Sequence, residues 1–211
     1  MTLTALRPMI GKFTSGGGVA TAWRLRRGVF VTCAHALSWQ GPSSGLDVKL
    51  SLGDGVVVDA KASSHQKFSG LGRSDRSVID PFDIAVLLAP GNQTRAAFGI
   101  AAAPPVKGGS LLIAGFPRQG GLKAIAPKNG LHGADGVALL YHEREPRPSL
   151  RKLAVGMSGS AVLDDAGQAI AVHLAGGSTA SVTNPPSSPS RATLAAGLLL
   201  RAELAKWLGQ F

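Results

Sequence analysis

Short apolar runs separated by glycine, proline and serine dominate the chain, and apolar positions alternate with polar ones through most of them. This alternation is typical of strands with one buried face. The pattern predicts strands at 18–23, 28–33, 46–52, 55–62, 84–88, 110–114, 136–141, 160–163, 168–174 and 192–197. Many short strands with little helix predict an all-β protein built from barrels or a sandwich.

One helix is expected, at the end of the chain. Leu200, Leu204, Trp207 and Leu208 follow the helical period, which predicts a helix that closes a lobe. Before it, the tract STASVTNPPSSPS, residues 178–190, consists of small polar residues and proline. Such a composition is typical of an exposed loop.

The strands fall into two groups of similar size. A segment rich in proline and glycine, residues 89–109, lies between them and reads as a link. The sequence therefore predicts two β lobes, residues 1–95 and residues 96–211, and a chain of 211 residues is long enough to bury a substantial core in this arrangement.

The chain has a single cysteine, Cys33, so no disulfide can form within it. This favours a reducing compartment, most simply the cytoplasm, although a secreted protein that dispenses with disulfides fits as well. The opening residues MTLTALRPMIGKF lack the apolar run of a signal peptide, but a signal already removed would leave the same sequence. No apolar stretch is long enough to cross a membrane, so no membrane partner is expected.

The chain is basic, with 22 Lys and Arg against 12 Asp and Glu and a formal charge of +10. This charge favours acidic partners through long-range attraction. The basic residues occur in small separate groups with few aromatic residues between them, whereas single-stranded nucleic acid is usually bound by a continuous stripe with stacking rings. Nucleic acid is therefore an unlikely partner.

Three reactive side chains lie beside apolar strands and tight turns. His35 follows a strand in FVTCAHAL, Asp83 precedes an apolar strand in DPFDIAVLLA, and Ser158 lies in the glycine-flanked turn VGMSGSAVL. Each alone is common in structural positions, as a cap or turn residue. Together they occur in the order His, Asp, Ser, which is the order of the chymotrypsin triad, a standard template for this chemistry.

The segments around these residues resemble known motifs. TCAHAL is similar to the TAAHC-type histidine motif, FDIAVLLA to the DIALL-type aspartate motif, and GMSGSAVL to the GDSGGP or GNSGS serine motif of chymotrypsin-fold serine proteases. The intervals, 48 residues from His35 to Asp83 and 75 from Asp83 to Ser158, agree with that family. IAGFPRQG and AVHLAGG resemble the GYP and GIHxGG segments of its bacterial glutamyl endopeptidase-like branch.

The resemblance covers the chain from about Gly17 to the terminal helix. It implies two six-stranded antiparallel β-barrels with a C-terminal α-helix, and a serine endopeptidase that cleaves protein or peptide substrates through an acyl-enzyme. Ser158 would be the nucleophile, His35 the general base and Asp83 its carboxylate partner. The backbone N–H groups of Gly156 and Ser158 would form the oxyanion hole.

The same resemblance implies substrate-binding residues. His173 would line the primary specificity pocket, and the backbone of Leu174, Ala175 and Gly176 would pair with the substrate as an added strand. Where the branch has a threonine that helps to bind an acidic side chain, this chain has Leu153. Because a carboxylate wants several donors, cleavage after glutamine or a medium-sized apolar residue stays open beside cleavage after an acidic residue.

No cofactor and no metal site are expected. Cys33 lies on a strand pattern, which indicates a small apolar core residue rather than a reactive thiol. His65, His132 and His142 lack partners at spacings typical of metal ligands, although two glutamates follow His142. GGLKAIAPKNG lacks the ending of a phosphate-binding loop.

A second function of a different class remains open. An unregulated protease would harm a cytoplasm, and the sequence shows no recognisable propeptide. The chain is therefore also compatible with a catalytically silent binding module of protease fold, or with a protease that a regulatory protein partner must activate.

Overall fold

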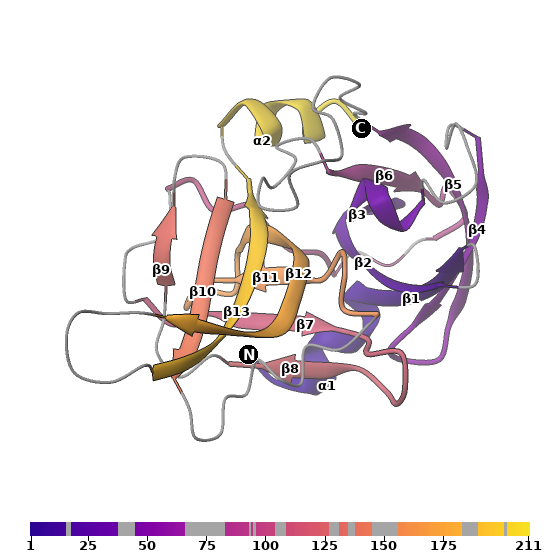
Figure 1. The fold of residues 1–211 in the computed structure, drawn as a ribbon. Helices are drawn as coiled ribbons and strands as arrows, with labels where there is room; N and C mark the ends of the chain where they lie inside the picture. The colour runs from indigo at the N-terminus through magenta and orange to yellow at the C-terminus, as the bar shows by residue number, and fades with distance from the viewer. Residues whose placement is uncertain are drawn as a thin grey trace.

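The computed structural model describes residues 1–15, 18–37, 45–65, 83–92, 94, 96–103, 109–126, 131–134, 138–144, 156–182, 190–200 and 202–211. They form a mostly β molecule with a closed barrel beside a second sheet, and short helices near the two chain ends (Figure 1). Among these residues, no helix has both the length and the apolar character needed to span a bilayer.

The first lobe is a closed antiparallel barrel with the strand order β1-β2-β3-β6-β5-β4. Its interior is filled by apolar side chains such as Phe13, Phe30 and Leu87. Alternation is clearest in β4, where every second residue is buried. The strands are β1 (Ile10–Ser15), β2 (Gly18–Arg26), β3 (Val29–Thr32), β4 (Asp47–Leu52), β5 (Val57–His65) and β6 (Ala85–Leu88), preceded by α1 (Leu3–Leu6) and the 3-10 turn η1 (Arg7–Met9).

The second lobe is a seven-stranded antiparallel sheet in the order β8-β7-β11-β12-β13-β10-β9. The all-β prediction is confirmed, and the first barrel has the expected six strands. In the second lobe, the described residues form an ordered sheet that runs from β8 to β9 rather than a six-stranded ring. Its strands are β7 (Leu112–Gly115), β8 (Lys123–Ile125), β9 (Leu131–Ala134), β10 (Ala138–Arg144), β11 (Ala161–Leu163), β12 (Ala169–Val182) and β13 (Ser190–Leu199).

The expected loop at 178–190 is wrong at both of its ends. β12 continues to Val182 and β13 begins at Ser190, and the two pair in register from Val182↔Ser190 to Ser178↔Leu194. Residues 183–189 lie outside the described residues. Small polar residues have low strand propensity, but the ladder hydrogen bonds of a long hairpin depend on backbone groups and override that preference.

A single apolar cluster joins the two lobes. It contains Trp23 from β2, Val172 from β12, and Leu204 and Leu208 from the predicted C-terminal helix, which the structure places at Ala202–Leu208 (α2). The segment between the lobes is hydrogen-bonded to both, through Phe98 N to Arg24 O and Ala101 N to Ala169 O. The lobe boundary near residue 95 stays a prediction.

Candidate active site

His35 and Asp83 meet because of the way in which β3 and β6 pair. Thr32 of β3 lies opposite Ala85 of β6, so the residue groups that follow β3 and precede β6 are at the same end of the barrel. His35 lies in the 3-10 turn η2 (Ala34–Ala36), directly after β3. The structure therefore brings together two side chains that are 48 residues apart.

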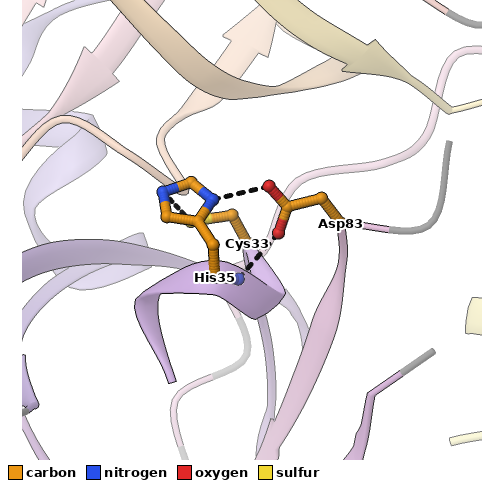
Figure 2. A group of neighbouring side chains, drawn as sticks. All are labelled: Cys33, His35 and Asp83. Carbon is orange, nitrogen blue, oxygen red and sulfur yellow. Dashed lines mark hydrogen bonds and ion pairs between the residues drawn. The ribbon is translucent and has the colours of Figure 1, made fainter. Parts of the chain in front are cut away.

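The Asp83 carboxylate holds the histidine at two atoms. One oxygen accepts from the backbone N–H of His35 at 2.7 Å, and the other lies 2.5 Å from ring Nδ1 (Figure 2). The first bond fixes the turn and the second fixes the ring. With Nδ1 held in this way, the second ring nitrogen, Nε2, is directed away from the carboxylate, as a general base requires.

The charge of this pair is governed by its surroundings. The His35 side chain keeps 40% of its surface exposed, and that of Asp83 keeps 14%. Partial burial opposes protonation of the ring, but the Cys33 sulfur and the Asp83 carboxylate outweigh it and raise the pKa of His35. An imidazolium formed during a reaction would therefore be stabilised in place.

Ser158 lies in a turn whose two flanking glycines are required for different contacts. Gly156 has a φ of +106°, and Gly159 has a φ of +86°. A methyl group on Gly156 would lie 2.7 Å from the Phe116 carbonyl oxygen, and one on Gly159 would lie 2.2 Å from that of Thr21. Both the left-handed backbone and the close approach exclude a side chain at these positions.

This turn packs against the barrel end that carries His35. A methyl group on Gly159 would also lie 3.2 Å from the backbone nitrogen of Cys33, two residues before His35. Thr21 N of β2 donates to Ser158 O at 2.9 Å, and Thr21 Oγ1 donates to Gly156 O at 2.9 Å. The serine turn is thus anchored beside η2 by groups of the first lobe.

The Ser158 hydroxyl donates to the backbone carbonyl of Leu174 at 3.1 Å. The structure shows the His35–Asp83 contact directly, and it places Gly159, the residue after Ser158, close to the backbone nitrogen of Cys33. The hydrogen bond from Ser158 to His35 that a complete triad needs stays a prediction, as does the oxyanion role of the Gly156 and Ser158 N–H groups.

His173 is buried within β12, directly behind the serine turn. The backbone N–H of His173 donates to Ser160 O at 2.8 Å, and its backbone carbonyl accepts from Gly159 N at 2.7 Å. Burial, and to a smaller degree the nearby His35, lowers the pKa of His173 to about 3. The ring is therefore neutral at physiological pH.

The residues predicted to bind the substrate backbone lie on the next stretch of β12. Ala175 and Gly176 pair with β13 on one side, whereas β11 pairs with β12 only from Ala169 to Val172. The stretch from Leu174 to Gly176 therefore extends beyond β11. Leu153 lies outside the described residues, so its predicted role stays a prediction.

Two contacts at the site were missed by reasoning from the sequence. Thr21 joins the serine turn to the first lobe, but a threonine within a strand carries no signal of such a role. Cys33 Sγ lies 3.6 Å from His35 Nε2, although its strand pattern indicated only a core position. The two-residue spacing was the one available signal for the second contact.

The comparisons with known proteins agree with this architecture. A family model described as "Trypsin-like peptidase domain" matches residues 16–172. No curated protein matches the chain. The support from sequence comparison is therefore the match to this family model.

Several solved structures share the fold over almost the whole chain. A Glu endopeptidase is 19% identical, with a TM-score of 0.67 and coverage of 100% of this chain and 94% of that one. The inactive form of the Rv3671c protease of M. tuberculosis is 19% identical, with a TM-score of 0.61 and coverage of 99% and 91%. A serine endoprotease from Yersinia pestis is 13% identical, with a TM-score of 0.65 and coverage of 99% and 64%.

Proposed function

Because the chain belongs to the family of trypsin-like peptidase domains, we propose that it is a serine endopeptidase with Ser158 as nucleophile, His35 as base and Asp83 as its carboxylate partner. The observation that carries this proposal is the double contact of the Asp83 carboxylate with the backbone N–H and the ring Nδ1 of His35. A carboxylate that holds both atoms orients the imidazole for proton transfer at Nε2.

The reaction proceeds through an acyl-enzyme. His35 Nε2 takes the proton of the Ser158 hydroxyl while the oxygen attacks the peptide carbonyl, and it then gives that proton to the leaving amine. The oxyanion is stabilised by the N–H groups of Gly156 and Ser158, each worth about 3 kcal/mol in the transition state. A water molecule activated by the same imidazole then releases the acyl group.

Ser158→Ala tests this assignment. We expect it to abolish both cleavage of a casein-like substrate and labelling by a serine-directed fluorophosphonate. Ser160→Ala is the matched control, because Ser160 is a buried serine of the same turn whose Oγ has no hydrogen-bond partner among the described residues. Labelling that persists in Ser158→Ala would contradict the proposal. So would a wild-type protein that cleaves the substrate although the fluorophosphonate fails to label it.

We further propose cleavage after acidic residues or glutamine, with His173 at the base of the specificity pocket and Leu153 on its wall. The neutral ring of His173 has one N–H to donate, which suits either a carboxylate or a carboxamide. The formal charge of +10 favours the acidic substrate by steering. A backbone stretch at Leu174–Gly176 that extends beyond β11 supports pairing with the substrate strand.

Profiling with a peptide library tests this preference. We expect enrichment of Glu, Asp or Gln before the cleaved bond, and we expect His173→Leu to reduce that enrichment while cleavage of other sequences persists. Enrichment of apolar residues in the wild-type protein would overturn the proposed pocket and leave the catalytic assignment intact.

One observation favours a second candidate, a protease that a protein partner must activate. The Ser158 hydroxyl donates to Leu174 O, which is a backbone acceptor that the proposed substrate strand would use. In this arrangement the hydroxyl must turn before attack. Degradation of a denatured protein by the purified chain without additions would exclude the gated form; activity only after a partner is added would support it.

A further inference from the structure

A thiol lies against the catalytic imidazole, next to the ring nitrogen that Asp83 does not contact. Cys33 Sγ is 3.6 Å from His35 Nε2, whereas the Asp83 carboxylate contacts Nδ1 (Figure 2). Sulfur, ring nitrogen and carboxylate oxygen all lie within 4.8 Å of one another. The proposed triad uses the carboxylate and the imidazole but assigns nothing to the thiol.

The separation of sulfur and nitrogen matches that of two ligands on one tetrahedral metal ion. Zn²⁺ binds thiolate at about 2.3 Å and imidazole at about 2.0 Å, which at a tetrahedral angle separates the two ligand atoms by roughly 3.5 Å. We propose that a thiophilic metal ion of the Zn²⁺ class binds between Cys33 Sγ and His35 Nε2 and reversibly inhibits the enzyme.

The groups around this pair suit such an ion. A histidine that ligates a metal usually donates its other ring N–H to a carboxylate, which is the place that Asp83 occupies. A thiolate with an imidazole selects Zn²⁺ or Cu⁺ over Mg²⁺ or Ca²⁺, which prefer oxygen ligands. On binding, Cys33 Sγ and His35 Nε2 release the protons they carry to solvent, and the ion exchanges two water molecules for sulfur and nitrogen.

A metal ion can reach Cys33 Sγ and His35 Nε2 from the solvent-exposed face of the His35 ring. Cys33 itself is fully buried, but the His35 side chain keeps 40% of its surface exposed. Two positions of a tetrahedral ion would remain for water, so binding is expected to be reversible by a chelator. An ion on Nε2 takes the lone pair that accepts the Ser158 proton; this inhibitory consequence rests on the proposed function, whereas binding of the ion does not.

Cobalt(II) provides a direct test, because thiolate-bound cobalt has a charge-transfer absorption in the near ultraviolet. The chain contains one cysteine, so this band can come only from Cys33. Wild-type protein without a polyhistidine tag is titrated with Co²⁺. We expect the band to saturate at one ion per chain and to disappear when Zn²⁺ is added. Absence of the band would overturn the proposal without any variant.

Three variants distinguish the pair from other arrangements. Cys33→Ala should abolish the band, and His35→Ala should weaken Co²⁺ binding at least about tenfold, since one of two ligands is lost. His142→Ala removes an imidazole on β10 and is the matched control, in which binding should persist. Circular dichroism checks that each variant folds. Unchanged binding in folded His35→Ala would contradict the paired site.

Inhibition is measured separately, with each protein compared with its own rate before metal is added. Zn²⁺ should inhibit the wild-type protein, and a chelator should restore its activity. Inhibition of Cys33→Ala should need at least about tenfold more Zn²⁺. Equal inhibition of both proteins would overturn the inhibitory role of this site. If the wild-type protein has no peptidase activity but still shows the cobalt band, the proposed function is contradicted and the proposed metal site is supported.

Discussion

At the scale of single residues, two histidines near the serine turn have opposite surroundings. His35 is partly exposed and held by a carboxylate, so its pKa is raised. His173 is 2% exposed and lies near that first imidazole, so its pKa is lowered to about 3. One ring is thus suited to carry a proton, and the other is suited to remain neutral. The difference arises from burial and neighbours, since the side chains are identical.

The neutral state of His173 predicts a loss of stability in acid. Its folded pKa lies below the ordinary value of 6.5, so between about pH 6.5 and pH 3 the unfolded chain binds a proton that the folded chain does not. The free energy of unfolding should therefore fall with decreasing pH by up to ~1.4 kcal/mol per pH unit from this group. Above pH 6.5 both states are neutral and the contribution vanishes.

His173→Gln isolates this effect, because glutamine is neutral throughout. Urea midpoints between pH 6.5 and 4 should fall less steeply in the variant than in the wild-type protein. His35 acts in another window: its raised pKa stabilises the fold below about pH 6.5, and that stabilisation is lost as the pH rises through its folded pKa. Equal slopes below pH 6.5 in the two proteins would show that His173 takes up a proton within the fold.

At the scale of elements, the serine turn is shaped by glycines that face backbone atoms. Gly159 combines a φ of +86° with a space already filled by Thr21 O and Thr32 Oγ1. Gly120, in the connection from β7 to β8, has a φ of +98° and nothing within 4 Å of the place a methyl group would take. The two positions therefore separate backbone strain from crowding.

Alanine at these two positions should have different costs. Gly120→Ala should cost about 1 to 2 kcal/mol, because only the left-handed conformation is penalised. Gly159→Ala should cost a further ~1 to 3 kcal/mol for overpacking, and it should reduce fluorophosphonate labelling of Ser158. Urea unfolding measures both costs. Equal destabilisation by the two substitutions would mean that the turn has room to move away from β2.

At the scale of the whole molecule, one threonine of the first lobe joins it to two segments of the second. Thr21 Oγ1 donates to Gly156 O and accepts from Phe116 N, each at 2.9 Å, and both bonds are buried. Its backbone N–H donates to Ser158 O. The lobes are therefore held together by directional bonds at the serine turn as well as by the shared apolar cluster.

Thr21→Val tests this junction, because valine keeps the shape of threonine but lacks its hydroxyl. Gly156 O and Phe116 N would each lose a buried partner, at about 1 to 3 kcal/mol per group, and the turn should be less well positioned for catalysis. Thr21→Ser keeps the hydroxyl and is the matched control. The free energy of unfolding and kcat/KM should both fall more in Thr21→Val than in Thr21→Ser. Equal values in the two variants would show that the Thr21 hydroxyl does not join the lobes.

Much of the fold could be predicted because its signals are local. Alternation in DVKLSL is the direct imprint of a strand with one buried face, and this strand is β4. β1 was missed, since Gly11 and the charged Lys12 interrupt the apolar pattern of IGKFTS, and its strand form depends on pairing with β2 and β4. The extension of β12 to Val182 depends in the same way on β13.

The sequence by itself determined the strand pattern, the glycine-flanked turn around Ser158 and the chain order of the three predicted catalytic residues. These features depend on neighbouring residues and on backbone preferences. Only the tertiary structure decided that Asp83 holds His35 at two atoms, that Cys33 lies against the same ring, and that Thr21 bonds to Gly156 across 135 positions. Such contacts depend on how strands pair and lobes pack, which no local pattern of residues encodes.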